Sequence, residues 1–334
     1  MRISQLKQLI TARYKAGSNR SILIEGSPGI GKTEIPKQAA KELGIGCMII
    51  HAPLMQPEDY GFPVISADRE NVSFIVSKDK FPIVGSDCPD QGILVVDELP
   101  QTDNNGQKIL ANMLQAREIH GVKLKDGWVI VATGNRSTDR AGANRILSHL
   151  GNRVTRINLD VSLDDWTQWA LANNVKPEVI AFIRFRPELL NAFDSQQEIN
   201  PTPRSWVEGV SADLGVVGSE LEFETFKGAV GEGAAAEFTS FLRIYRELPS
   251  PDAIMLDPSN HAMANKPVVL YALCGALATR ATGDNFGRIM LYVSRMPAEF
   301  AVLFVKDAIR RKPEIQSSQS FIQWASTDGA KILT

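Results

Sequence analysis

Cysteine and histidine are scarce in this 334-residue sequence, which contains three cysteines and four histidines. Cys47, Cys88 and Cys274 lie far apart and form no CxxC pair, so neither a zinc-binding pattern nor a disulfide framework is indicated. A low cysteine content is typical of proteins in a reducing cytosol.

Long apolar runs and net charge are also lacking. Apolar runs such as 267–278 fall short of the ~20 residues that span a bilayer, and residues 1–15 lack the continuous apolar core of a signal peptide. The formal net charge is −2, which argues against a protein that coats nucleic acid. The sequence therefore predicts a soluble, cytoplasmic protein.

What the chain does contain changes in character near residue 160. Before it, short apolar runs alternate with segments of helical spacing, which is typical of a parallel sheet covered by helices on both faces. After it, helical spacing prevails, and a polar, proline-bearing stretch (248–267) interrupts the helices. We therefore predict an α/β domain at 1–160, an all-α domain at 161–247 and a helical C-terminal block at 248–334.

Individual elements follow from the same patterns. Strands are expected at 21–25, 47–51, 92–98, 128–135 and 153–159, helices at 3–16, 32–43 and 103–116, and hairpins at 62–76 and around 121–127. In the C-terminal block, Leu270, Leu273 and Leu277 recur at helical spacing, as do Phe300 and Phe304. Such stripes are more often buried core than docking surfaces.

The segment IEGSPGIGKTEI (24–35) fits the pattern GxxxxGK[ST] and lies between a predicted strand and a predicted helix. Its glycines allow backbone N–H groups to approach phosphate oxygens, and the helix N-terminus favours an anion. Lys32 is expected to reach the β- and γ-phosphates of ATP, and the Thr33 hydroxyl to hold Mg²⁺. The predicted phosphate loop comprises Gly26, Ser27, Pro28, Gly29, Ile30, Gly31, Lys32 and Thr33.

Polar residues also end two later strands of the predicted core, 92–98 and 128–135. The run ILVVDE places Asp97 and Glu98 at the carboxyl end of a strand, where open α/β sheets bind ligands. Beside a phosphate loop, Asp97 is expected to support Mg²⁺ and Glu98 to act as general base toward the attacking water. Asn135 ends the run WVIVATGN and is expected to orient that water or contact the γ-phosphate. Solvated acids and a Gly-Asn turn are the plainer alternatives.

The phosphate loop, ILVVDE, Asn135 and the helical second half together resemble the AAA+ ATPases, and more closely their MoxR branch. Further segments, within 1–245, carry the closer resemblance. They are an insert at 61–77, similar to the branch's insertion in helix 2; REIHGVKLKDGWVIVATGN (117–135), similar to its hairpin before sensor 1; LSHLGNRVTRINL (147–159), similar to its ANRF region but with Val154 for Phe; and TPRSW (202–206), similar to its sensor-2 helix.

Carried over by motif, the resemblance implies that Asn135 is sensor 1, Arg204 is sensor 2, and Arg153 is an arginine finger that reaches the ATP of a neighbouring subunit. The alternatives for the finger are Arg145 and Arg156. His51 stands where many relatives have an asparagine that tunes the catalytic glutamate, but a lone histidine is more often structural.

Arg204 also has an argument of its own. Thr202 suits an N-cap and Pro203 suits the first helical position, so Arg204 is expected in the first helical turn. A cation there opposes the helix dipole at a cost of about 0.3–1 kcal/mol, and a bound phosphate would remove that conflict. The plainer alternative is an arginine that extends into water.

For function, the resemblance implies a Mg²⁺-dependent ATPase that assembles into a ring, expected to be hexameric, and remodels a client or a von Willebrand factor A-domain partner. No membrane role is expected. A nucleic-acid motor that uses the hairpin KLKDGW (123–128) is one alternative, although no run of basic and aromatic residues supports it. An ATP-gated scaffold with little turnover and a small-molecule kinase are the others.

Overall fold

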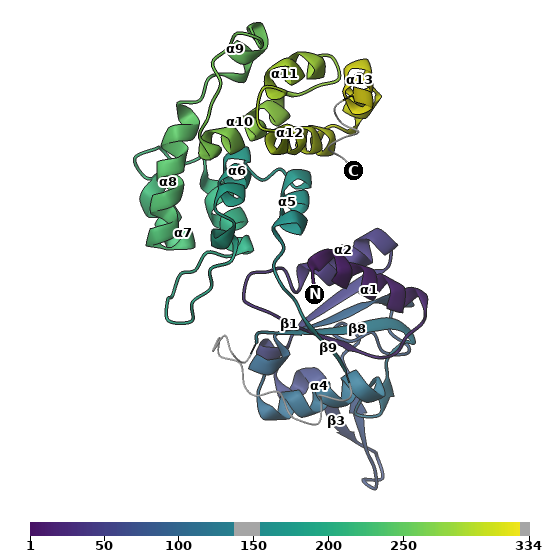
Figure 1. Cartoon of the computed structure of the whole chain (residues 1–334). Coiled ribbons are helices and arrows are strands. Elements are labelled where there is room, and N and C mark those ends of the chain that lie inside the picture. Colours follow the sequence, from purple (N-terminus) through teal and green to yellow (C-terminus); the bar gives the residue numbers. More distant parts are fainter. Residues whose placement is uncertain (137–153, 328–334) are drawn as a thin grey trace. The chain divides into compact units, whose positions relative to one another are not determined.

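The structure is a computed structural model that describes residues 1–136 and 154–327, and the chain forms two compact units (Figure 1). The first unit comprises Met1–Ser162 with Phe193–Gln196, and the second comprises Leu163–Ala192 with the chain from Gln197 onward. All strands of the described chain lie in the first unit. The predicted division into three domains stays a prediction.

Five parallel strands form the central sheet of the first unit, in the order β2-β5-β8-β1-β9. Their bounds are Gly46–His51 for β2, Gln91–Asp97 for β5, Gly127–Gly134 for β8, Ile22–Glu25 for β1 and Thr155–Asn158 for β9. The sheet confirms the predicted α/β fold class. Because all five strands run the same way, their carboxyl ends meet at one edge.

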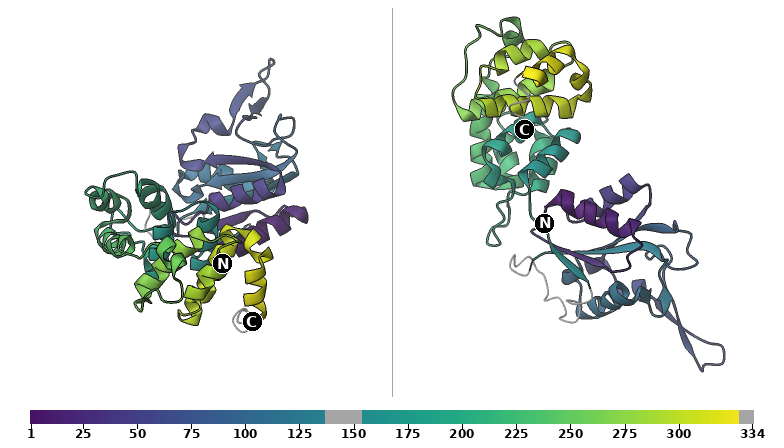
Figure 2. Two further views of the ribbon diagram at one scale, coloured as in Figure 1. Left: turned by 90° about the horizontal axis from the view of Figure 1, so that it is seen from above. Right: turned by 45° about the vertical axis from the view of Figure 1, so that its right-hand side comes forward.

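Helices cover both faces of this sheet (Figure 2). Alternate residues of each central strand point to opposite faces, which is why the strands are apolar throughout. On one face, Ile22 and Ile24 pack with helices α1 (Ile3–Lys15) and α2 (Glu34–Leu43). On the other face, Leu23 packs with helix α4 (Asn104–Ala116).

Two short antiparallel ribbons extend the first unit. A helical turn, α3 (Pro57–Tyr60), leads into the predicted hairpin of β3 (Phe62–Ile65) and β4 (Val72–Ile75). The second hairpin pairs β6 (Glu118–Ile119) with β7 (Val122–Lys123), so a hairpin lies where one was predicted, at the start of the region around 121–127. Its two-residue turn is at His120 and Gly121, whose φ angles of 48° and 81° suit a tight hairpin.

The second unit is helical, as the sequence predicted. Phe182, Trp206, Phe238 and Phe241 form the aromatic centre of its first part, with ring centroids 5.1–6.4 Å apart. The elements there are α5 (Leu163–Ala172), α6 (Pro177–Phe185), a 3₁₀ turn (Pro187–Leu190), a π-helical segment (Ser205–Ser211), α7 (Glu222–Val230) and α8 (Glu232–Arg246).

The C-terminal helices build a further apolar core. Leu270, Leu273 and Leu277 are buried in it, as predicted. The stretch 248–267 is not a plain linker, because it contains a helix whose Ile254 is fully buried in the same core. The elements of this part are α9 (Pro251–Leu256), α10 (Pro267–Arg280), α11 (Phe286–Val293), α12 (Ala298–Arg311), a 3₁₀ turn (Pro313–Ser317) and α13 (Gln319–Thr327).

A buried ion pair joins this C-terminal core to α6. The guanidinium of Arg184 on α6 donates two hydrogen bonds to the carboxylate of Asp307 on α12, and both side chains are almost fully buried. Breaking such a pair leaves a buried charge without its partner, which is strongly destabilising. The pair therefore holds α12 in register against α6. No helix of the described chain is long and apolar enough to cross a membrane.

Candidate active site

The predicted phosphate loop connects the end of β1 to the start of α2. Gly29 and Gly31 have φ angles of 73° and 91°, a left-handed region that L side chains adopt with strain. A Cβ on Gly26 would lie 2.5 Å from Cδ1 of Ile30 and 3.0 Å from the carbonyl oxygen of Leu159. Glycine is therefore favoured at positions 29 and 31 by backbone conformation and at position 26 by close packing.

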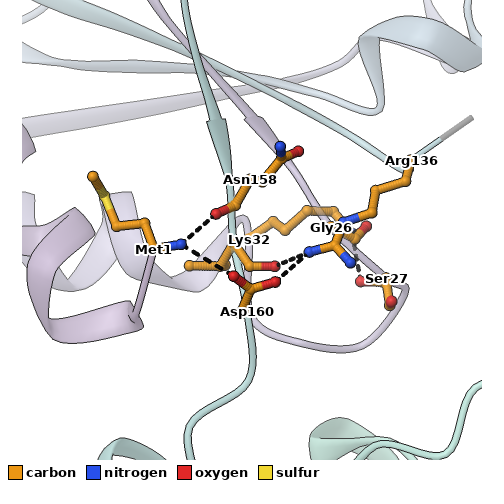
Figure 3. A network of polar contacts seen from close by, with 8 residues as sticks. Met1, Gly26, Ser27, Lys32, Arg136, Asn158 and Asp160 are labelled. Carbon is orange, nitrogen blue, oxygen red and sulfur yellow. Dashed lines mark hydrogen bonds and ion pairs between the residues drawn. The ribbon is translucent and has the colours of Figure 1, made fainter.

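Lys32 closes this loop on itself (Figure 3). Its ammonium donates to the carbonyl oxygens of Gly26 at 2.8 Å and Ser27 at 2.7 Å. It also donates at 2.9 Å to Oδ1 of Asn135, which lies just beyond the end of β8. The structure thus brings together the predicted phosphate-binding lysine and the predicted sensor 1. These acceptors hold the ammonium beside the loop.

Asp97 lies at the end of β5 and receives hydroxyl donors from both sides. Thr33 Oγ1 donates to its Oδ1 at 2.6 Å, and Thr133 Oγ1 donates to the same oxygen at 2.5 Å. The Nδ1 atom of His51 lies 3.4 Å from the other carboxylate oxygen. A hydroxyl and a carboxylate at hydrogen-bond distance offer the hard oxygen ligands that Mg²⁺ prefers, so Thr33 and Asp97 fit the predicted ion.

Glu98 has an unusual backbone. Its φ and ψ angles of 56° and 36° are left-handed, which costs a residue with a side chain about 1–2 kcal/mol. Its N–H donates to Thr133 Oγ1 at 3.1 Å, and Leu99 and Pro100 after it are buried. The Glu98 side chain itself is exposed. Such strain clusters at functional sites, and here it coincides with the predicted general base.

Thr133 and the contact of His51 with Asp97 are the parts of this site that sequence reasoning missed. Thr133 reads as an ordinary strand former, because β-branched residues favour strands. The signal that would have found it is register: Val96 pairs with Ala132, so the next residue on each strand, Asp97 and Thr133, are also neighbours.

Arg156, an alternative for the finger, is bound within its own chain. Its guanidinium forms two hydrogen bonds, at 2.9 and 2.7 Å, with the carboxylate of Glu25, which is buried at the end of β1. This partner raises the pKa of Arg156 above its ordinary value. Arg153, the predicted finger, and Arg145 lie outside the described residues.

Arg136 follows Asn135 and holds the chain that leaves the sheet after β9 (Figure 3). It donates to the carbonyl oxygen of Leu159 at 2.8 Å and to Asp160 Oδ1 at 2.6 Å. This bond lowers the pKa of the Asp160 carboxyl. The amine of Met1 donates to the carbonyl oxygen of Asn158 at 2.7 Å beside it. These bonds therefore hold the segment after β9 beside the end of β8, which the predicted sensor 1 follows.

Arg204 belongs to the second unit. The Ser205 N–H donates to Thr202 Oγ1 at 3.2 Å, so Thr202 caps the helix that begins at Pro203, as predicted. The Arg204 side chain is exposed in the first turn, and a π-helical segment follows it directly. Such segments are frequent at functional sites. Its role as sensor 2 stays a prediction.

The fold brings the predicted phosphate loop beside the predicted acidic strand end, and sequence comparison finds a similar family. Residues 22–158 match the family described as ATPase family associated with various cellular activities (AAA). Over these residues the chain is similar to an AAA ATPase domain, which supports the predicted ATP-hydrolysing enzyme. No curated protein matches the chain in sequence.

Solved structures similar to the chain share little sequence with it. NtrX from Brucella abortus, in complex with ADP, is 14% identical, with 98% of this chain and 65% of that chain covered and a TM-score of 0.34. A DNA polymerase III gamma subunit-related protein from Thermotoga maritima is 12% identical, with coverage of 92% and 99% and a TM-score of 0.38. A RuvB mutant from Thermotoga maritima is 13% identical, with coverage of 95% and 86% and a TM-score of 0.35. At these TM-scores the likenesses carry no argument.

Replacing Gly134 by alanine tests the packing behind Glu98. A Cβ on Gly134 would lie 2.5 Å from Cγ and 2.7 Å from Cδ of Pro100, a ring that cannot rotate away. We expect Gly134→Ala to lower the free energy of unfolding by about 1–3 kcal/mol, as overpacking does, and to reduce ATP turnover by displacing the Glu98 turn. Urea unfolding followed by circular dichroism and a phosphate-release assay measure the two effects.

Gly228→Ala is the matched control, because nothing lies within 4 Å of its Cβ position on α7. It is expected to leave turnover unchanged and to stabilise the helix by about 0.5–1 kcal/mol. Wild-type stability and turnover in Gly134→Ala would contradict the packing account.

Proposed function

We propose that the chain hydrolyses Mg²⁺-bound ATP as a MoxR-like AAA+ ATPase and uses the cycle to remodel or activate a partner protein, with active sites shared between the subunits of a hexameric ring. One observation supports the chemistry above all others. The Thr33 hydroxyl is bonded to Asp97, which joins the phosphate loop to the acidic strand end, while Lys32 joins the same loop to Asn135.

Each residue then has a task in hydrolysis. Lys32 exchanges its carbonyl acceptors for the β- and γ-phosphate oxygens, and the loop N–H groups bind the same phosphates. Asn135 orients the attacking water, and the Glu98 carboxylate takes the proton that this water loses as its oxygen bonds to the γ-phosphorus and ADP leaves. Thr33 and Asp97 would hold Mg²⁺, which neutralises charge on the phosphate oxygens when bound.

The pairing of two nearby arginines with carboxylates of the same chain supports a site shared between subunits. Arg136, which follows β8, and Arg156, on β9, are held by Asp160 and Glu25 of the same chain. A further cation at the γ-phosphate would have to come from another residue, and Arg153 of a neighbouring subunit is the one that the MoxR resemblance assigns. AAA+ proteins are generally oligomeric, which agrees with this assignment.

The hairpin of β3 and β4 supports the proposed partner protein. It exposes Phe62, Ile65, Val72 and Ile75, each by 60–64%, on a ribbon that projects from the first unit (Figure 1). Exposed apolar side chains gathered on one element are typical of protein-interaction sites. The insert resembles the MoxR insertion in helix 2, and the von Willebrand factor A-domain partner follows from that resemblance.

Separating nucleotide binding from turnover tests the proposed chemistry. Lys32→Ala should weaken the binding of a fluorescent ATP analogue at least about tenfold, because it removes the phosphate cation. Glu98→Gln should keep that binding but lower kcat by about 10²–10⁴-fold, because it removes the general base. Glu42→Gln, an exposed carboxylate at the end of α2, is the control and should turn over normally. Undiminished turnover in Glu98→Gln would refute the general base.

Mixing inactive variants tests whether sites are shared. Arg153→Ala and Glu98→Gln should each be nearly inactive alone. Mixed one to one in a ring, an Arg153→Ala subunit supplies Glu98 and a Glu98→Gln neighbour supplies Arg153, so roughly a quarter of the interfaces are complete. Phosphate release should recover to about that fraction.

The control for this mixing experiment is Glu98→Gln with Lys32→Ala, which affect the same half of the site, so no interface is complete and no activity returns. Equal inactivity of both mixtures, with mixed oligomers confirmed by native mass spectrometry, would contradict a finger at Arg153.

A further inference from the structure

Thr133 is completely buried on β8, two residues before Asn135. A buried hydroxyl must find partners, and in a strand it has many backbone carbonyls to choose from. The Thr133 hydroxyl instead makes two hydrogen bonds to the residues at the end of β5. It donates to Asp97 Oδ1 at 2.5 Å and accepts from the Glu98 N–H at 3.1 Å. One hydroxyl thus connects the predicted Mg²⁺ ligand to the predicted general base.

Each of these two bonds fixes a different degree of freedom. The bond to Asp97 restricts rotation of its carboxylate, whose other oxygen faces His51 at 3.4 Å. The bond from Glu98 gives its N–H a side-chain acceptor on β8, at a residue that follows the end of β5 and has a left-handed φ of 56°. Without an acceptor at this place the N–H of Glu98 would lose its partner in the interior.

Thr33 does not make Thr133 redundant. Both hydroxyls donate to the same oxygen of Asp97, but in the proposed function Thr33 also serves Mg²⁺ and lies at the edge of the phosphate loop. Thr133 has no exposed surface, so its hydroxyl is not at the edge of the loop as Thr33 is, and its bonds are to Asp97 and Glu98.

We propose that Thr133 is a positioning residue of the ATPase site: its hydroxyl sets the orientation of the Asp97 carboxylate and the left-handed turn at Glu98, and so aims the Glu98 side chain at the attacking water. The inference rests on the proposed function for its catalytic consequence. The alternative is a threonine that only completes the core, and the experiment separates the two.

Thr133→Val keeps the shape of the side chain and removes the hydroxyl, whereas Thr133→Ser keeps the hydroxyl and removes a methyl group. We expect Thr133→Val to lower kcat by about tenfold or more while the KM for ATP changes less than about threefold, because the Glu98 carboxylate loses its orientation whereas ATP binding is kept. Ser should retain at least about half of the wild-type kcat although its core packing is poorer. A merely structural role predicts the opposite order, since Val fills the core better than Ser.

A second readout does not depend on turnover. Hydrogen exchange at the Glu98 amide, followed by NMR, should be slow in the wild type and in Thr133→Ser. It should be at least about tenfold faster in Thr133→Val. If Val does not fold, Thr133→Ala against Thr133→Ser makes the same comparison. Unchanged exchange and a kcat within twofold of wild type in the variant without the hydroxyl would overturn the inference, as would a Ser variant as inactive as Val.

Failure of the proposed function has a different signature. If the wild type does not release phosphate from ATP, the exchange comparison still decides whether Thr133 sets the turn at Glu98. If the wild type hydrolyses ATP and Thr133→Val does so equally fast, the inference on Thr133 fails while the proposed function stands.

Discussion

The pairing of β8 with β5 on one side and with β1 on the other places Asp97, Asn135 and the predicted phosphate loop close to one another. Parallel strands in register bring their carboxyl ends to one edge. The strand pairing alone therefore makes neighbours of Asp97, Thr133 and the loop after Glu25. The remaining contacts, Thr33 with Asp97 and Lys32 with Asn135, need only side-chain lengths. A strand order that separated β1 from β8 would leave the phosphate loop without its acidic partner.

The sequence predicted this half of the molecule well because its signals are local. Apolar runs gave the strands, and the fixed spacing of Gly26, Lys32 and Thr33 gave the loop. The α/β fold class is confirmed, and so is an ATP-hydrolysing enzyme. The roles of the individual residues stay predictions. Thr133 was missed because its importance arises from a neighbouring strand, and no pattern along β8 itself distinguishes it from a strand former.

In the second unit, the sequence predicted the helices but not how they pack. Helical spacing predicted its helices, but which helices pack together depends on pairs such as Arg184 and Asp307, which are 123 positions apart. Helix α9 was missed because a short helix between prolines has too few turns to show a period, although its Ile254 is fully buried. The exposed apolar hairpin of β3 and β4 was predicted as a ribbon, but its exposure became visible only in the fold.

Phosphate release from ATP by the wild-type chain, measured across Mg²⁺ concentrations, tests the central claim most directly. We expect turnover that requires Mg²⁺, saturates with it and stops in a chelator, because the Thr33 hydroxyl and the Asp97 carboxylate lie together and offer the oxygen ligands that Mg²⁺ prefers. Turnover that is equal in a chelator would contradict the assignment of Thr33 and Asp97. A preparation that binds ATP but releases no phosphate at any Mg²⁺ concentration would contradict the catalytic assignment of Glu98.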